Sequence, residues 1–184
     1  PAPTGRDRAG AENNMKRNIP IAVVRGGGEL GTGVACSLWQ AGYRVICAEL
    51  RQPLAIRRSV AFASALYDGR IVIAGIQGER IGVADEAIFL WARKTLPVII
   101  DPDARIIAIF QPELVVDAIG AGAASGTTLA HAPCVIGLGA GFNAGQDCHA
   151  VSETRGGPDA GRVIWHGAVP DAGVREASVD EARH

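Results

Sequence analysis

The sequence lacks the long apolar segments and the blocks of like charge that mark several classes of protein. No apolar run in its 184 residues reaches about 18 positions, so we expect no transmembrane helix and no membrane partner. Its 18 Lys and Arg residues stand against 19 Asp and Glu residues, which gives a net charge of -1. This balance offers no basic surface for nucleic acid and differs from that of a disordered chain.

The short motifs of common catalytic and metal sites are missing as well. The four cysteines, at positions 36, 47, 134 and 148, have no C-x2-C spacing, so we interpret them as buried thiols in a reducing compartment. Residues 1–18 contain no apolar signal region, and we therefore expect a cytoplasmic protein. No G-x-S-x-G, H-E-x-x-H or S-x-x-K motif indicates a hydrolase. Any chemistry would then depend on a bound cofactor.

Glycine is the residue that the sequence has in excess. It occupies 24 of 184 positions, or about 13%, against an average of about 7%. The apolar share of 48% is enough for a hydrophobic core, and the length predicts one domain, which we place at residues 19–169. We expect residues 1–18 to form a disordered tail, with Met15 as the natural start, and residues 170–184 to form a loose tail.

Apolar runs and helical spacings alternate along the chain. The strands expected are 18–25, 43–50, 70–75, 96–101, 114–117 and 134–138, followed by two short, antiparallel strands at 149–154 and 162–166. The helices expected are 30–42, 54–67 and 83–94. This order predicts a Rossmann-like three-layer α/β fold, with an open, mostly parallel sheet and a short β-rich C-terminal extension.

The most specific local motif is G-x-G-x-x-G at residues 26–31. Gly26 permits a tight turn, Gly28 lets a backbone approach a pyrophosphate, and Gly31 lets the helix pack closely on the strand, with Gly27 inside the turn. Glu49 ends the next strand near the offset of a ribose-binding acid. We interpret this motif as a nucleotide or phosphate site, and a tight turn that binds nothing is the alternative.

Other candidate binding residues are two arginines in the expected helix 54–67 and two aspartates at the ends of expected strands. Arg57 and Arg58 could neutralise phosphate, or they could belong to a solvated helix face with an ion pair. Asp101 and Asp117 end apolar strands, where ligands of open α/β sheets bind, although Asp101 also starts an ordinary turn sequence.

A second glycine cluster follows the strand at 134–138. Its glycines, Gly137, Gly139 and Gly141, could form a phosphate-binding loop or a flexible turn, and no lysine follows as in a Walker loop. Asp147, His149 and Glu153 alternate on one strand face and have the side-chain types of metal ligands. Because no second histidine is near, we interpret this row as structural and predict no metal site.

Several longer segments together carry a family resemblance. They are VVRGGGELGTGVACSLWQAGYRVICAEL, PLAIRRSVAFASALYDG, LPVIIDPDA, LVVDA, GTT, APCVIGLGAGFNAGQDCHAV, SET and GRVIWHG, in order from about residue 20 to 173. This series resembles the YqeB-type accessory proteins of selenium-dependent molybdenum hydroxylases, which are related to the nucleotide-fold part of XdhC/CoxI-type maturation factors. The resemblance implies a role in finishing or delivering the molybdenum cofactor. It also implies that the glycine loops, Arg57, Arg58, Asp101, Asp117 and Glu153 are binding positions.

The chain departs from that family pattern at three places. The stretch 119–125 has no charge where the family has basic and amide residues, Ala140 replaces a proline, and residues 155–158 lack an Asn and a His. These changes favour binding of a ligand without its chemical processing.

The leading hypothesis is therefore an accessory protein that binds a molybdopterin dinucleotide or another nucleotide. Its partner would be a molybdenum hydroxylase or another cofactor-maturation protein. A small NAD(P)-dependent oxidoreductase is the first alternative, but neither Tyr43 nor Tyr67 has the lysine four residues on that a short-chain dehydrogenase needs. A non-catalytic interaction module is the second alternative. Apolar edge strands on a domain this small are also consistent with a homodimer.

Overall fold

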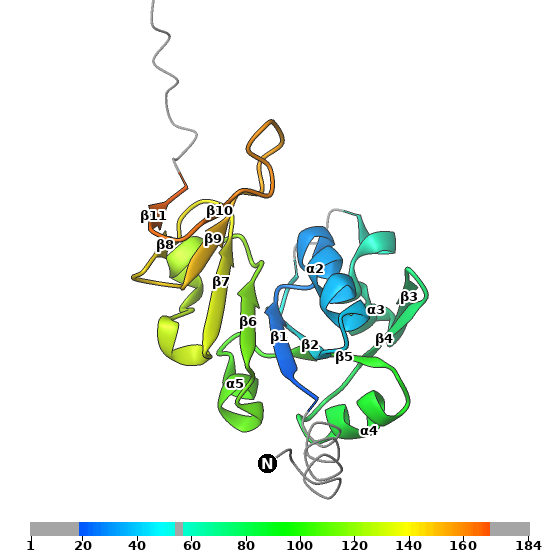
Figure 1. Cartoon of the computed structure of the whole chain (residues 1–184). Coiled ribbons are helices and arrows are strands. Elements are labelled where there is room, and N and C mark those ends of the chain that lie inside the picture. Colours follow the sequence, from blue (N-terminus) through cyan, green and yellow to red (C-terminus); the bar gives the residue numbers. More distant parts are fainter. Residues whose placement is uncertain (1–18, 54–56, 170–184) are drawn as a thin grey trace, which may run out of the picture.

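A nine-stranded, mostly parallel sheet forms the centre of the protein (Figure 1). The computed structural model describes residues 19–53 and 57–169. The strand order is β10-β9-β7-β6-β1-β2-β5-β4-β3. All neighbouring strands pair in parallel except β3 with β4 and β9 with β10, at the two edges. The expected α/β class and the mostly parallel sheet are therefore confirmed.

The helices and strands have the following bounds. The large sheet contains β1 (Ile21–Arg25), β2 (Arg44–Glu49), β3 (Arg70–Ile73), β4 (Ile76–Arg80), β5 (Leu96–Ile100), β6 (Leu114–Asp117), β7 (Cys134–Leu138), β9 (Ala150–Ser152) and β10 (Val163–Ile164). A second sheet pairs β8 (Asn143–Ala144) with β11 (Gly167–Ala168). The α-helices are α2 (Glu29–Gln40), α3 (Ala65–Asp68), α4 (Glu86–Ala92) and α5 (Arg105–Phe110). The 3-10 helices are η1 (Arg58–Val60), η2 (Phe62–Ser64), η3 (Gly122–Ser125) and η4 (Leu129–His131).

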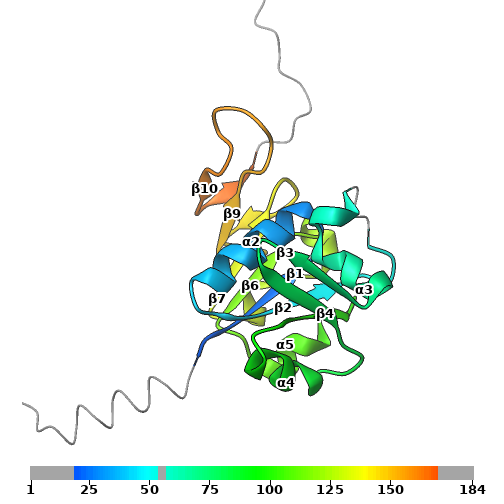
Figure 2. The same cartoon turned by 90° about the vertical axis from the view of Figure 1, so that its right-hand side faces the viewer.

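Both faces of the sheet are apolar, because its central strands carry continuous apolar runs. Val24 and Cys47 contribute to the core on the side of α2 and α3. The residues next to them, Val23 and Ile46, point the opposite way and pack with side chains of α4 and α5. Figure 2 shows α2 and α3 on one side of the sheet and α4 and α5 on the other. Burial on both faces explains why these strands read as uninterrupted apolar sequence.

The region expected to be a helix at 54–67 folds differently. Residues 54–56 of that helix, like the tails expected at 1–18 and 170–184, lie outside the described residues. Beyond them, Arg57 and Ala61 have extended backbone and each precedes a short 3-10 helix, the second of which leads into the four-residue helix α3. The prediction of a continuous helix was wrong, because the extended backbone at Ala61 turns Phe62 into the core, where it is fully buried.

Strand β4 and helix α5 are among the elements that the sequence did not predict. Residues 76–80 form β4, which makes an antiparallel hairpin with β3 through a turn at Ala74 and Gly75, both with positive φ. Residues 105–110 form α5, for which no helix was predicted. The expected antiparallel pairing at 149–154 and 162–166 is correct between β9 and β10, but β9 itself pairs in parallel with β7.

Within the described ranges, no helix has both the length and the apolar character needed to cross a membrane.

The position of Phe62 gives a test of this corrected segment. We expect Phe62→Ala to lower the free energy of unfolding by about 3–5 kcal/mol, because the change removes a large side chain from a closed core. The matched control is Tyr67→Ala, since Tyr67 lies in the same segment but is 57% exposed. Urea unfolding of both variants measures the difference. Equal, small effects would contradict the core position of Phe62.

Candidate functional site

The turn between β1 and α2 has the geometry that its glycines predict. Gly26 has a φ of +90°, which favours glycine, and its N–H donates to the carbonyl of Ala48 at 2.8 Å. A Cβ on Gly31 would lie 1.8 Å from the carbonyl oxygen of Gly26, so only glycine lets the helix start this close to the turn. A Cβ on Gly28 would meet no atom within 4 Å. Gly28 is therefore the glycine that faces open space.

A small hollow of about 70 Å³ lies beside this turn. Its lining residues are Gly26, Gly28, Glu49, Leu50, Ala118 and Ile119. These residues come from the carboxyl ends of β1 and β2 and from the segment that follows β6. Because β2 and β6 flank β1 on opposite sides, the strand order reverses at this point. In open α/β sheets, that is where ligands bind.

Glu49 lines the hollow but already has hydrogen-bond donors from the backbone. Its side chain is only 4% exposed and accepts the N–H of Gly27 at 2.5 Å and the N–H of Leu50 at 2.9 Å. Burial raises the pKa of Glu49, and these two N–H donors oppose that rise. The carboxylate thus holds the glycine turn in place. Contact between Glu49 and a ribose stays a prediction.

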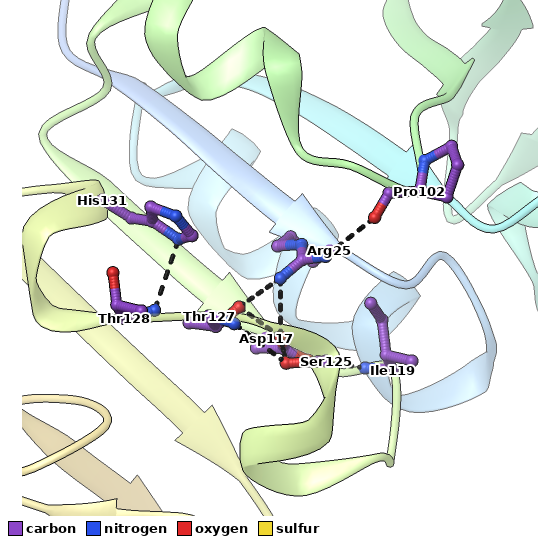
Figure 3. Close-up of polar contacts among 8 residues, drawn as sticks. All are labelled: Arg25, Pro102, Asp117, Ile119, Ser125, Thr127, Thr128 and His131. Atoms are coloured by element: carbon purple, nitrogen blue, oxygen red, sulfur yellow. Dashed lines mark hydrogen bonds and ion pairs between the residues drawn. The ribbon is translucent and has the colours of Figure 1, made fainter.

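The densest polar cluster lies on the neighbouring strands, at the ends of β1 and β6 (Figure 3). Arg25 and Asp117 are paired residues in the parallel register, and their side chains form a buried ion pair of 3.3 Å. The same carboxylate accepts hydrogen bonds from Ser125 at 2.6 Å and Thr127 at 2.5 Å, and its other oxygen accepts the N–H of Ile119 at 3.0 Å. Asp117, a candidate binding residue, is completely buried and holds this segment of backbone, and its contact with a ligand stays a prediction.

Arg25 is a residue that sequence reasoning missed. It ends the apolar strand β1, is 2% exposed, and donates to Thr127 and to the carbonyl of Pro102, the latter at 3.3 Å. Its Nε is buried and has no partner in the described part of the chain. Burial, together with the nearby Arg25 charge, lowers the pKa of His131. The signal that could have found Arg25 was a charged residue directly between an apolar strand and a glycine turn.

The remaining polar candidates are spread along the carboxyl edge. The Asp101 carboxylate accepts the N–H groups of Arg105 and Ile106, at 3.0 and 2.9 Å, and so fixes the start of α5. Arg57 pairs with Glu29 at the surface. Arg58 pairs with Asp68 at 3.4 Å and stands over the ring of Tyr67.

The second glycine loop is required by packing. A Cβ on Gly137 would lie 2.5 Å from the ring of Phe142, and one on Gly139 would lie 2.8 Å from the hydroxyl of Thr154. Gly141 has a φ of +91° and lies against Gly122, whose own Cβ would be 2.6 Å from the Gly141 oxygen. These contacts account for the glycines without a ligand, and phosphate binding there stays a prediction.

The row of possible metal ligands makes contacts within the protein. Glu153 forms an ion pair of 2.7 Å with Arg155, and hydrogen bonds from Arg155 lower the pKa of Glu153 to about 2. Asp147 accepts the N–H of Asn143, and His149 accepts the N–H of Val135. Among residues 19–53 and 57–169, no three His, Cys, Asp or Glu side chains are grouped to hold a metal ion.

A further hollow was not predicted. It has a volume of about 620 Å³ and lies between α5 and η4, and Gln111 and His131 contribute its polar side chains. Small apolar side chains, including Ile107, Ala108 and Ala132, form most of its lining. None of its lining residues belongs to the glycine motif or to the small hollow beside that motif.

The fold and the first site together define an α/β protein with a mostly parallel sheet and a glycine turn at the carboxyl end of its first strand. The chain is homologous to the Escherichia coli (strain K12) protein whose name reads "Uncharacterized protein YqeB", with 41% identity over 151 residues. The aligned region is 82% of this chain and 28% of that protein, so the chain spans less than a third of its relative's length. No family model and no solved structure matches the chain.

The contribution of the buried ion pair between Arg25 and Asp117 to stability can be tested by mutation. We expect Asp117→Asn to cost about 3–5 kcal/mol of stability, because the Arg25 charge stays buried without its counter-charge. The double variant Arg25→Met/Asp117→Asn should lose less, since it removes both charges and keeps a hydrogen-bond acceptor. Urea unfolding measures both.

A matched control comes from an exposed pair near the same edge. Asp103 and Arg105 are 2.8 Å apart, and their side chains are 60% and 79% exposed. Asp103→Asn should change stability by less than about 1 kcal/mol. An equally small effect of Asp117→Asn would show that the buried pair is not a constraint on the fold.

Proposed function

We propose that this chain binds a phosphate-bearing ligand, of the nucleotide class, at the turn formed by residues 26–31. The single observation that carries this proposal is the open space at Gly28 beside the hollow that Glu49 lines. At such a turn, backbone N–H groups and the start of a helix meet a ligand's phosphate. The helix that starts there, α2, has 12 residues and no side-chain cap at Gly28.

The arrangement of the strands supports a Rossmann-like, three-layer interpretation of the fold. The five central strands follow the order β5-β2-β1-β6-β7, with the glycine turn directly after β1. This order corresponds to the 3-2-1-4-5 order of nucleotide-binding α/β proteins. Similarity of fold raises the expectation of a nucleotide, but function depends on the residues of the site.

The resemblance noted in the sequence suggests which nucleotide to test first. We propose a molybdopterin dinucleotide, and with it a role as an accessory protein in the maturation of a molybdenum hydroxylase, which would be the partner. Binding without catalysis agrees with the contacts of Asp101, Asp117 and Glu153, whose carboxylates accept backbone N–H groups within the protein.

A thermal-shift titration tests the proposal directly. The ligands are molybdopterin cytosine dinucleotide, CTP, GTP, and NAD and NADP in both redox states. A ligand at 100 times its Kd should stabilise the protein by about 2.7 kcal/mol, which is several degrees in Tm. A shift with the molybdopterin dinucleotide or CTP supports the accessory role. A shift with NAD(P) alone would favour an oxidoreductase, and no shift with any ligand would contradict nucleotide binding.

Gly28 provides the variant that places the site. We expect Gly28→Leu to fold, since its φ of -65° suits any residue and no atom lies near its Cβ. Its side chain should fill the space a phosphate needs and weaken binding at least tenfold. The control is Gly33→Leu on the same helix, at an exposed position with equally open surroundings. Undiminished affinity of Gly28→Leu, measured by calorimetry, would place the site elsewhere.

A further inference from the structure

The first residue of α2 carries an acidic side chain next to the proposed phosphate position. Glu29 binds Arg57 through three contacts: its carboxylate accepts the backbone N–H at 3.0 Å, Nε at 2.9 Å and Nη2 at 2.5 Å. The two residues lie 28 positions apart in the chain. The contact therefore joins the segment after β2 to the start of the helix.

The Glu29 carboxylate resembles the phosphate that the site is proposed to bind, because both groups are anions. The start of a helix favours negative charge, and a guanidinium binds a carboxylate and a phosphate with the same two-pronged geometry. Hydrogen bonds from Arg57 lower the pKa of Glu29, so its carboxylate stays ionised at neutral pH. Glu29 thus holds a cation of the kind that binds phosphate, and it places a negative charge directly after Gly28.

This pair can separate without disturbing the core. The side chains of Arg57 and Glu29 are 72% and 30% exposed, whereas those of Arg25 and Asp117 are 2% and 0% exposed. Exposed pairs contribute little to stability, and a phosphate can replace the carboxylate at modest cost. Arg58 is less suited to this exchange, because it pairs with Asp68 at 3.4 Å and not with a residue of α2.

We propose that Glu29 is an internal competitor of the ligand's phosphate for Arg57. In the empty site Glu29 holds the guanidinium, and in the bound state the phosphate takes it over. Glu29 thereby lowers affinity and keeps weakly bound anions out of the glycine turn. This inference rests on the proposed function, because it concerns a phosphate bound at residues 26–31.

Calorimetric titration of three variants tests the competition. The probes are inorganic pyrophosphate and the nucleotide that gives the largest shift with the unmodified protein. Glu29→Gln should tighten binding about twofold to fivefold, as expected for one charge near a helix start. Arg57→Lys keeps the charge but not the two-pronged geometry, and it should weaken binding by a similar factor. The control is Glu79→Gln, since Glu79 is also 30% exposed and pairs with Arg93, and its affinity should not change.

The outcomes separate this inference from the proposed function. Unchanged or weaker binding by Glu29→Gln would overturn the competition, and so would normal binding by Arg57→Lys, while binding that Gly28→Leu abolishes would leave the proposed function standing. If neither the unmodified protein nor any variant binds a probe, both the proposed function and the competition fail. Circular dichroism and Tm of each variant confirm that affinities are compared between folded proteins.

Discussion

The ion pair between Arg25 and Asp117 is the constraint on which the carboxyl edge of the sheet depends. It joins the ends of β1 and β6 at the point where the strand order reverses, and it lies almost completely out of water. A charge in such a position is stable only while its partner and its hydrogen bonds are present. Asp117 therefore also fixes the backbone after β6, through Ile119, and that backbone is one wall of the hollow at the glycine turn.

The acidic side chains of this edge share one structural role. Glu49, Asp101 and Asp117 each accept backbone N–H groups where a strand passes into the following segment. A carboxylate in such a position holds the backbone that surrounds a site. The groups left to meet a ligand are then backbone amides at the glycine turn and charges at the surface, which suits recognition of a phosphate more than acid–base catalysis.

Much of the fold could be predicted because central parallel strands such as β1, β5 and β6 are apolar on both faces and end at or just before a glycine or an aspartate. The glycine turn and its register with Glu49 could also be predicted, since Gly26 needs a positive φ and Gly31 packs against the carbonyl of Gly26 five residues earlier. The segment around Phe62 could not, because its apolar spacing suits a helix and only the core decides against one. The partner of Arg25 lies 92 residues away, and local sequence contains no sign of such a contact.

The close approach of Gly122 to Gly141 links two loops that are far apart in the chain. Their backbones touch where side chains would otherwise stand, so neither loop has room to gain a Cβ at that point. The uncharged stretch 119–125 is therefore a surface that fits the second glycine loop. In evolutionary terms, we expect the two loops to be inherited as one unit. A homologue that carries larger residues in one of them must have rebuilt the other, so the two loops should diverge together.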